Sequence, residues 1–155
     1  MYEYKEYINQ MLKNPNIKFL FICLSILLVS TSISSWIQSS KGAVKVSSFV
    51  LPTQNNQSLA VDFFIPNSAT SDNKAPFIVV IPGFQRSKEA LSNIAIELAR
   101  RGFVVASIDP YAQGHSSSSM SRRSATTEGY GMFALVDYVY ASDQYNFIDK
   151  TRIGA

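Results

Sequence analysis

Two short apolar runs on either side of an amphipathic helix constrain this chain more than any other feature. Residues 76–81 (PFIVVI) and 103–108 (FVVASI) do not alternate apolar with polar side chains, which is typical of strands buried on both faces. Between them, residues 87–101 carry apolar side chains at helical spacing, with Ser87 and Glu89 at the start and Gly102 after the end. This order predicts two parallel strands joined by a crossover helix.

The segments on either side extend this pattern. Residues 43–51 and 58–65 are rich in β-branched side chains and flank a polar turn, so they predict an antiparallel hairpin. A second helix is expected over 128–141, with Phe133, Val136 and Tyr140 marking one side and with Leu135 and Val139 near it. A further strand is expected from Thr151. The predicted fold class is therefore α/β, with a hairpin followed by parallel strand–helix–strand–helix–strand.

A strongly apolar segment precedes this domain. Residues 19–37 are about as long as the span of a bilayer core, and Trp36 falls where an interfacial aromatic residue belongs. We therefore divide the chain into a lead-in at 1–16, a transmembrane anchor at 17–37 and an α/β domain at 43–155. A cleaved signal peptide is the alternative, because the strongest apolar part covers only residues 19–29. The long charged lead-in favours the anchor.

The charges around this segment bear on orientation and on partners. Lys5, Lys13 and Lys18 precede it, whereas Lys41 and Lys45 follow it, and this slight bias favours an extracytoplasmic domain. The formal net charge is +3, with no basic stripe interleaved with aromatic residues. That pattern argues against a nucleic-acid partner.

Few side chains in the chain are candidates for chemistry. The single cysteine, Cys23, lies inside the apolar run, so no disulfide can form within the chain. Asp62 alternates with apolar neighbours and is expected to face solvent, Asp137 is expected to point outward from its helix, and Glu89 belongs to a helix start. No spacing of carboxylates, histidine and cysteine indicates a metal site, and no cofactor is expected.

Four motifs, taken in order, resemble the α/β-hydrolase superfamily and, within it, the dienelactone-hydrolase-like and esterase-like branch. They are VVIPGF (79–84), ELARRGF (97–103), VVASIDPYAQGHS (104–116) and DKTRIGA (149–155). The resemblance covers about residues 46–155. It implies a serine hydrolase that takes a small acyl or ester substrate, including thioesters. Together with the apolar segment, this predicts a membrane-anchored hydrolase that contacts membrane lipid through its anchor.

The same resemblance assigns one part of the active site to this chain. It implies that the turn at Gly83 leads into an oxyanion loop, in which the backbone N–H of Phe84 is one donor. Pro82 stands where the family often has histidine, which removes a side chain but leaves that amide free. The alternative is an ordinary strand-to-helix turn.

The catalytic triad itself is expected beyond Ala155. The family's nucleophile lies in a G-x-S-x-G turn after the next strand, so the domain in this chain is expected to stop just before it. Residues 114–118 (GHSSS) look like such a turn, but residues 110–113 separate them from the strand, so Ser116 is not the expected nucleophile. His115 is not expected to be catalytic, and Asp109 is expected to organise this loop.

Two functions therefore remain open at this point. The first is a serine hydrolase whose fragment within this chain is inactive alone. The alternative is a non-catalytic short product or a binding module that uses part of the fold.

Overall fold

The computed structural model describes residues 14–38, 40–53, 56–117 and 129–155, in two units that cover residues 1–38 and 39–155. The first unit holds helix α2 (Pro15–Gln38). The second holds, in chain order, β1 (Val44–Pro52), β2 (Ser58–Pro66), β3 (Ala75–Val80), η1 (Lys88–Leu91), α3 (Ser92–Arg100), β4 (Val104–Ile108), η2 (Gly129–Gly131), α5 (Met132–Ala141), η3 (Asp143–Tyr145) and β5 (Ile148–Gly154), where η marks a short 3-10 helix. Most of the predicted lead-in and the expected helix start at 128 lie outside the described residues.

Helix α2 is long and apolar enough to cross a membrane, a property that a signal sequence shares. Its hydroxyl side chains bond back to its own backbone. Ser25 Oγ donates to the carbonyl oxygen of Phe21 (2.8 Å), and Ser30 Oγ donates to that of Ile26 (2.7 Å). These bonds satisfy the hydroxyl groups without water, so the serine-rich half of the helix remains compatible with lipid.

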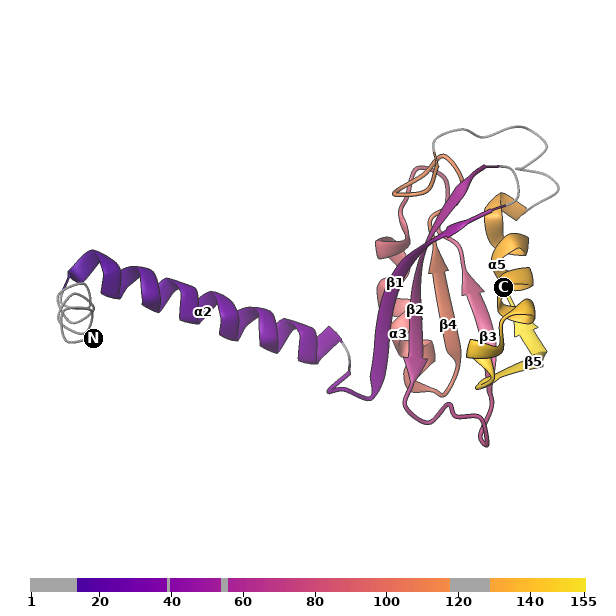
Figure 1. Cartoon of the computed structure of the whole chain (residues 1–155), viewed down its shortest axis with the longest axis horizontal. Helices are drawn as coiled ribbons and strands as arrows, with labels where there is room; N and C mark the ends of the chain where they lie inside the picture. Colours follow the sequence, from indigo (N-terminus) through magenta and orange to yellow (C-terminus); the bar gives the residue numbers. More distant parts are fainter. Residues whose placement is uncertain (1–13, 39, 54–55, 118–128) are drawn as a thin grey trace, which may run out of the picture. The chain divides into compact units, whose positions relative to one another are not determined.

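The five strands form one sheet in the order β1-β2-β4-β3-β5 (Figure 1). β1 and β2 form the predicted antiparallel hairpin, and β3 pairs in parallel with both β4 and β5. The predicted fold class is therefore confirmed. The sequence did not indicate that β2 also pairs with β4, antiparallel, which joins the hairpin to the parallel strands.

The chain changes direction around β3, because it passes to β4 on one side of β3 and then returns to β5 on the other. With crossovers of one handedness, such a reversal places the two connecting helices on opposite faces of the sheet. Figure 1 shows α3 and α5 on opposite faces. The carboxyl ends of β3 and β4 lie at one edge of the sheet, where open α/β sheets bind their ligands.

Each face of the sheet has its own apolar core. The core under α5 is the larger one and includes the fully buried Phe63, Phe77, Ile108 and Leu135. The core under α3 is built around Val105 and the two buried alanines of that helix. Full burial of a side chain such as Phe77 stabilises the fold by ~1.5–3 kcal/mol.

The two helices differ in detail from the sequence expectation. The first begins as the 3-10 turn η1, and Ser87 precedes this turn without a capping hydrogen bond from its side chain. In α5 the buried side chains are Leu135 and Val139, whereas the predicted Phe133 and Tyr140 are exposed. Gly102, which follows α3, has a left-handed backbone, and the helix ends there as predicted. Gly131, which precedes α5, is also left-handed, and α5 starts after it, later than predicted.

The glycine before α5 provides a test of this packing. Gly131 has φ +101°, and a Cβ there would lie 2.6 Å from Cδ1 of the fully buried Leu59. Gly102 has a similar φ of +93° but open space around it. Gly102→Ala should therefore cost only backbone strain of about 1–3 kcal/mol. Gly131→Ala should cost about 1–3 kcal/mol more, because overpacking is added.

Thermal unfolding of the full chain in detergent, followed by circular dichroism, measures both variants. Equal losses in the two variants would contradict the close packing of Gly131 against β2.

Candidate functional site

Two turns leave the sheet side by side at the carboxyl ends of β3 and β4. Val80 is paired in register with Ser107, so the turn that starts at Pro82 and the turn that starts at Asp109 begin at neighbouring points. The resemblance assigns the oxyanion loop to the first of these turns, and the structure places both Gly83 and Phe84 there.

The first turn is closed by a hydrogen bond from the backbone N–H of Arg86 to the carbonyl oxygen of Gly83 (3.2 Å). The left-handed backbone lies at Gln85 (φ +60°) and not at Phe84, which is the pattern of a type II turn. This turn does not use the N–H of Phe84. Phe84 is 82% exposed, so this residue lies at the surface.

The second turn holds the first one in place. The backbone N–H of Arg86 also lies 3.1 Å from Oε1 of Gln113, and the backbone N–H of Lys88 donates to Oδ1 of Asp109 (2.6 Å). Both acceptors come from the loop that follows β4. The segment from Gly83 to η1 is therefore held to the neighbouring loop by two hydrogen bonds.

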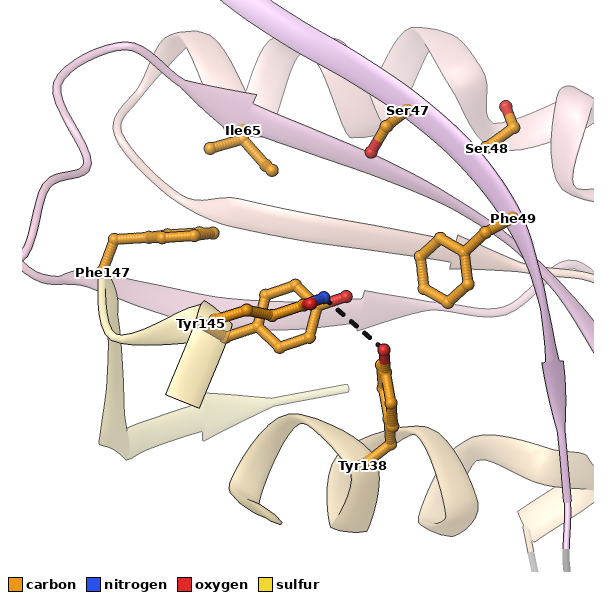
Figure 2. A pocket seen from close by; sticks show the side chains of 8 residues that line it. Ser47, Ser48, Phe49, Ile65, Tyr138, Tyr145 and Phe147 are labelled. Atoms are coloured by element: carbon orange, nitrogen blue, oxygen red, sulfur yellow. Dashed lines mark hydrogen bonds between the residues drawn. The ribbon is translucent and has the colours of Figure 1, made fainter. Parts of the chain in front are cut away.

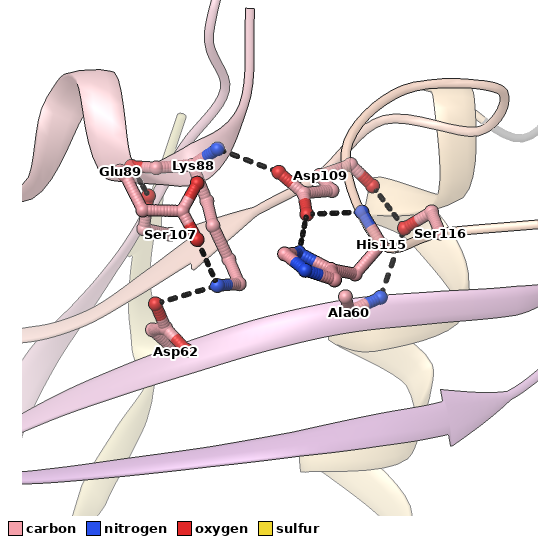
Figure 3. A network of polar contacts seen from close by, with 8 residues as sticks. All are labelled: Ala60, Asp62, Lys88, Glu89, Ser107, Asp109, His115 and Ser116. Carbon is pink, nitrogen blue, oxygen red and sulfur yellow. Dashed lines mark hydrogen bonds and ion pairs between the residues drawn. The ribbon is translucent and has the colours of Figure 1, made fainter.

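Asp109 is fully buried and both of its carboxylate oxygens accept hydrogen bonds (Figure 3). Oδ2 accepts the backbone N–H of His115 (2.8 Å). Gly114 approaches so closely that a Cβ there would lie 2.2 Å from Oδ2. Asp109 therefore organises the loop, as the sequence indicates.

The structure gives Ser116 and His115 structural positions. Ser116 Oγ donates to the carbonyl oxygen of Asp109 (2.5 Å) and accepts the backbone N–H of Ala60 (2.9 Å). Its proton thus goes to a main-chain carbonyl instead of a base. The His115 side chain is 77% exposed, with Nδ1 3.6 Å from Oδ2 of Asp109. Neither residue is arranged for nucleophilic catalysis, in agreement with the sequence analysis.

A buried ion pair beside this turn was missed by the sequence analysis. Asp62 does not face solvent as expected, because its side chain is only 16% exposed and its Oδ2 lies 3.0 Å from Nζ of Lys88 (Figure 3). Lys88 Nζ also contacts Oε1 of Glu89 (2.7 Å). The available signal was a charged residue on an otherwise apolar strand, which is as consistent with a buried pair as with a solvent-facing side chain.

This pairing shifts two pKa values. Burial lowers the pKa of Lys88, but the hydrogen bonds and charges of Glu89 and Asp62 outweigh it and raise the pKa overall. The hydrogen bond from Lys88 is the main cause that lowers the pKa of Glu89 to about 2. The pair of Lys88 with Glu89 therefore stabilises the fold at pH values above the usual pKa of a glutamate. This contribution is lost as the pH falls towards 2.

Three residues with side chains and positive φ lie at the same edge, whereas others lie elsewhere, including in the segment before β1. Gln85, Ala112 and Tyr130 have φ values of +60°, +64° and +57°, and the N–H of Tyr111 donates to the carbonyl oxygen of Tyr130. Such conformations are costly for residues with a side chain, and they concentrate at functional sites. Within the described part of the chain, no group of three or more histidine, cysteine, aspartate or glutamate side chains is placed to hold a metal ion.

The role of Asp109 can be measured with a matched pair of variants. Asp109→Asn replaces one acceptor oxygen by an NH2 group that faces a backbone N–H, so we expect a loss of about 1–3 kcal/mol in the free energy of unfolding. Asp137→Asn, on the exposed side of α5, should change stability by less than about 0.5 kcal/mol. Denaturant unfolding of the full chain measures both, and an Asp109→Asn variant as stable as Asp137→Asn would refute the role of this carboxylate.

Comparison with known proteins gives similarity in structure and not in sequence. No family model matches the chain, and no curated protein matches it. A hypothetical protein of Pseudomonas aeruginosa is similar with a TM-score of 0.58 and 24% identity, over 72% of this chain and 34% of that protein. The α/β hydrolase GrgF of Penicillium sp. is similar with a TM-score of 0.57 and 20% identity, over 71% and 37%.

An esterase of Pyrococcus furiosus, Pf2001, is similar with a TM-score of 0.56 and 16% identity, over 75% of this chain and 44% of the esterase. The chain thus spans between a third and under half of the length of these proteins. The similarity does not single out the dienelactone-hydrolase-like branch. The strand order, the two-faced core and these neighbours together show that residues 44–154 have the fold of the amino-terminal portion of an α/β hydrolase.

Proposed function

We propose that this chain supplies the amino-terminal part of a serine hydrolase that cleaves esters, thioesters or related acyl compounds. In this proposal the backbone N–H of Phe84 binds the oxyanion that forms when the nucleophile attacks the acyl carbon. The turn of Gly83 and Phe84 at the end of β3 is the observation that carries the proposal, because it leaves that N–H out of the turn's own hydrogen bond.

The register of the sheet supports this assignment. Gly154 of β5 is level with Ile78 of β3, so the backbone of β5 runs beside β3 towards the turn at Gly83. A nucleophile on a sharp turn shortly after Ala155 would reach the same edge as Phe84. The fold requires such an arrangement for acyl transfer, because nucleophile and donors must converge on one carbonyl group.

We further propose that α2 stays attached and anchors this hydrolase to the membrane, with the domain outside the cytoplasm. The apolar length of α2 and its internally bonded serines support a lipid-embedded helix. Such an anchor would keep the domain close to acyl substrates in or near the membrane.

The first experiment is to express the gene with the codons that follow Ala155 and to label the membranes with a fluorophosphonate. We expect the label on a serine within about ten residues after Ala155, in a G-x-S-x-G turn. A stop codon directly after Ala155, or a product without a labelled serine, would reject the hydrolase and leave a non-catalytic role.

The oxyanion donor is tested by removal of one N–H. Phe84→Pro removes the backbone donor, and proline fits the second position of a type II turn, so the turn itself should persist. Loss of one such donor lowers kcat by roughly 10²–10³-fold. Phe84→Ala keeps the N–H and serves as the control, with kcat expected within about tenfold of the original. Equal kcat values for both variants would show that Phe84 donates no hydrogen bond to the transition state.

The anchor and its orientation are tested by labelling a single introduced cysteine. In a Cys23→Ser background, Ser71→Cys places a thiol on an exposed loop between β2 and β3. A membrane-impermeant maleimide should label it in intact cells, whereas the original chain, with only Cys23, should stay unlabelled. Labelling only after lysis would reverse the proposed orientation. The mass of the purified protein shows whether α2 is retained. A mass that corresponds to a chain without the residues up to the end of α2 would indicate a cleaved signal sequence and not an anchor.

A further inference from the structure

A cavity of about 420 Å³ opens on the side of the sheet covered by α5 (Figure 2). It lies away from the turn at Phe84. Ile65 follows the β2 residue that pairs with Val105 near the start of β4, and Phe147 directly precedes β5. The carbonyl oxygen of Phe147 accepts the backbone N–H of Ala75 at the start of β3. The cavity therefore extends to the amino-terminal edge of the parallel strands and is separate from the proposed oxyanion site.

Aromatic rings from four segments line the cavity. Phe49 comes from β1, Tyr138 from α5, Tyr145 from η3 and Phe147 from the chain just before β5. The rings support each other, with centroids 6.2 Å apart for Phe49 and Tyr138 and 5.7 Å apart for Tyr138 and Tyr145. Phe63 stacks on Tyr145 from the core side (5.3 Å). These contacts pack the rings against one another along the wall of the cavity, which is open to solvent.

The polar groups of the cavity are few and uncharged. Ser47 contributes from β1, and Nε2 of Gln144 lies 3.5 Å from the Tyr138 hydroxyl (Figure 2). Burial is the main cause that raises the pKa of Tyr145 to about 12, so this phenol stays neutral. No lysine, arginine, aspartate or glutamate is among the lining residues that the structure describes.

We propose that this cavity binds a neutral, flat aromatic molecule of one or two rings that carries one hydroxyl or carbonyl group. The aromatic walls favour a planar ring through stacked and edge contacts. The hydroxyl and amide groups of Ser47, Tyr138 and Gln144 provide hydrogen bonds for one polar substituent. The volume lies in the range of small-molecule sites, which combine apolar walls with a few polar groups. The inference does not depend on hydrolase activity.

The absence of charge in the lining decides the class of ligand. A carboxylate would lose part of its hydration on entry, gain no ionic partner there and face the negative π surfaces of the rings. A ligand with one polar group can form hydrogen bonds with these hydroxyl and amide groups, which a purely apolar ligand cannot do. The neutral ligand with one polar substituent therefore fits best.

The test uses 2-naphthol as the probe and the full chain in detergent. The tyrosines are replaced by 3-fluorotyrosine, so that 19F resonances of Tyr138 and Tyr145 report occupancy of the cavity itself and not partition of the probe into detergent. We expect saturable shifts of both resonances. The anionic 2-naphthoate should bind at least about tenfold more weakly, because its charge is not compensated.

Two adjacent residues of β1 provide matched variants. Ser47→Phe places a ring in the cavity and should weaken binding of 2-naphthol at least about tenfold. Val46→Phe adds the same ring on the opposite face of the strand, because side chains alternate, and should leave binding unchanged within about twofold. Tyr138→Phe removes one hydroxyl group without changing the walls and should weaken binding up to about tenfold.

The outcomes separate the proposal from unspecific uptake. Shifts that saturate for 2-naphthol and disappear in Ser47→Phe, with unchanged fluorotyrosine signals elsewhere, support it. Equal affinities for 2-naphthol and 2-naphthoate would overturn it, and so would equal binding by Ser47→Phe and Val46→Phe. If Ser47→Phe does not fold, the other two measurements decide. The proposal is overturned if Tyr138→Phe binds 2-naphthol as tightly as the original chain and if 2-naphthol binds no more tightly than 2-naphthoate.

Discussion

The carboxylate of Asp109 is the interaction on which the candidate site depends. It is fully buried at the end of β4, and its two oxygens accept one N–H from the segment after β3 and one from its own loop. A buried carboxylate without such donors would be costly, whereas this one satisfies two backbone groups that would otherwise lack a partner. The position of the turn at Phe84 follows from this anchoring, because Lys88 carries one of the two N–H groups.

Lys88 joins the same region to the hairpin through its side chain. Its Nζ pairs with Asp62 on β2, while its carbonyl oxygen accepts the Ser107 hydroxyl (3.1 Å). One oxygen of Asp62 is buried without a hydrogen-bond partner among the described residues. Such a pair contributes little net stability, since desolvation offsets much of the attraction. Loss of Lys88 would leave Asp62 without its cation, whereas loss of Asp62 would leave Lys88 with Glu89 as its partner.

The sequence allowed the architecture to be predicted because that information is local. Runs without alternation identified β3 and β4, the hairpin was marked by its polar turn, and Gly102 marked the end of α3. The pairing of β2 with β4, the Asp62–Lys88 pair and the aromatic cavity involve residues far apart in the chain, so no local pattern indicates them. The apolar side of α5 was predicted only in part, because Phe133 and Tyr140 are exposed whereas the neighbouring Leu135 and Val139 are buried. The position of Phe84 was predicted from the resemblance alone, and its oxyanion role stays a proposal.

The strand order also determines when the sheet can close during synthesis. Val61 of β2 pairs with Ile108 of β4, which leaves the ribosome much later than the hairpin and after β3. Until β4 emerges, β2 is paired only with β1, and β3 has no partner because its neighbours β4 and β5 both come later. Unpaired strand edges promote association with other chains. β4 supplies the partner that both segments lack, and each of these pairings closes a loop of the chain at an entropic cost. The centre of the finished sheet is therefore formed after the strands that flank it have been made.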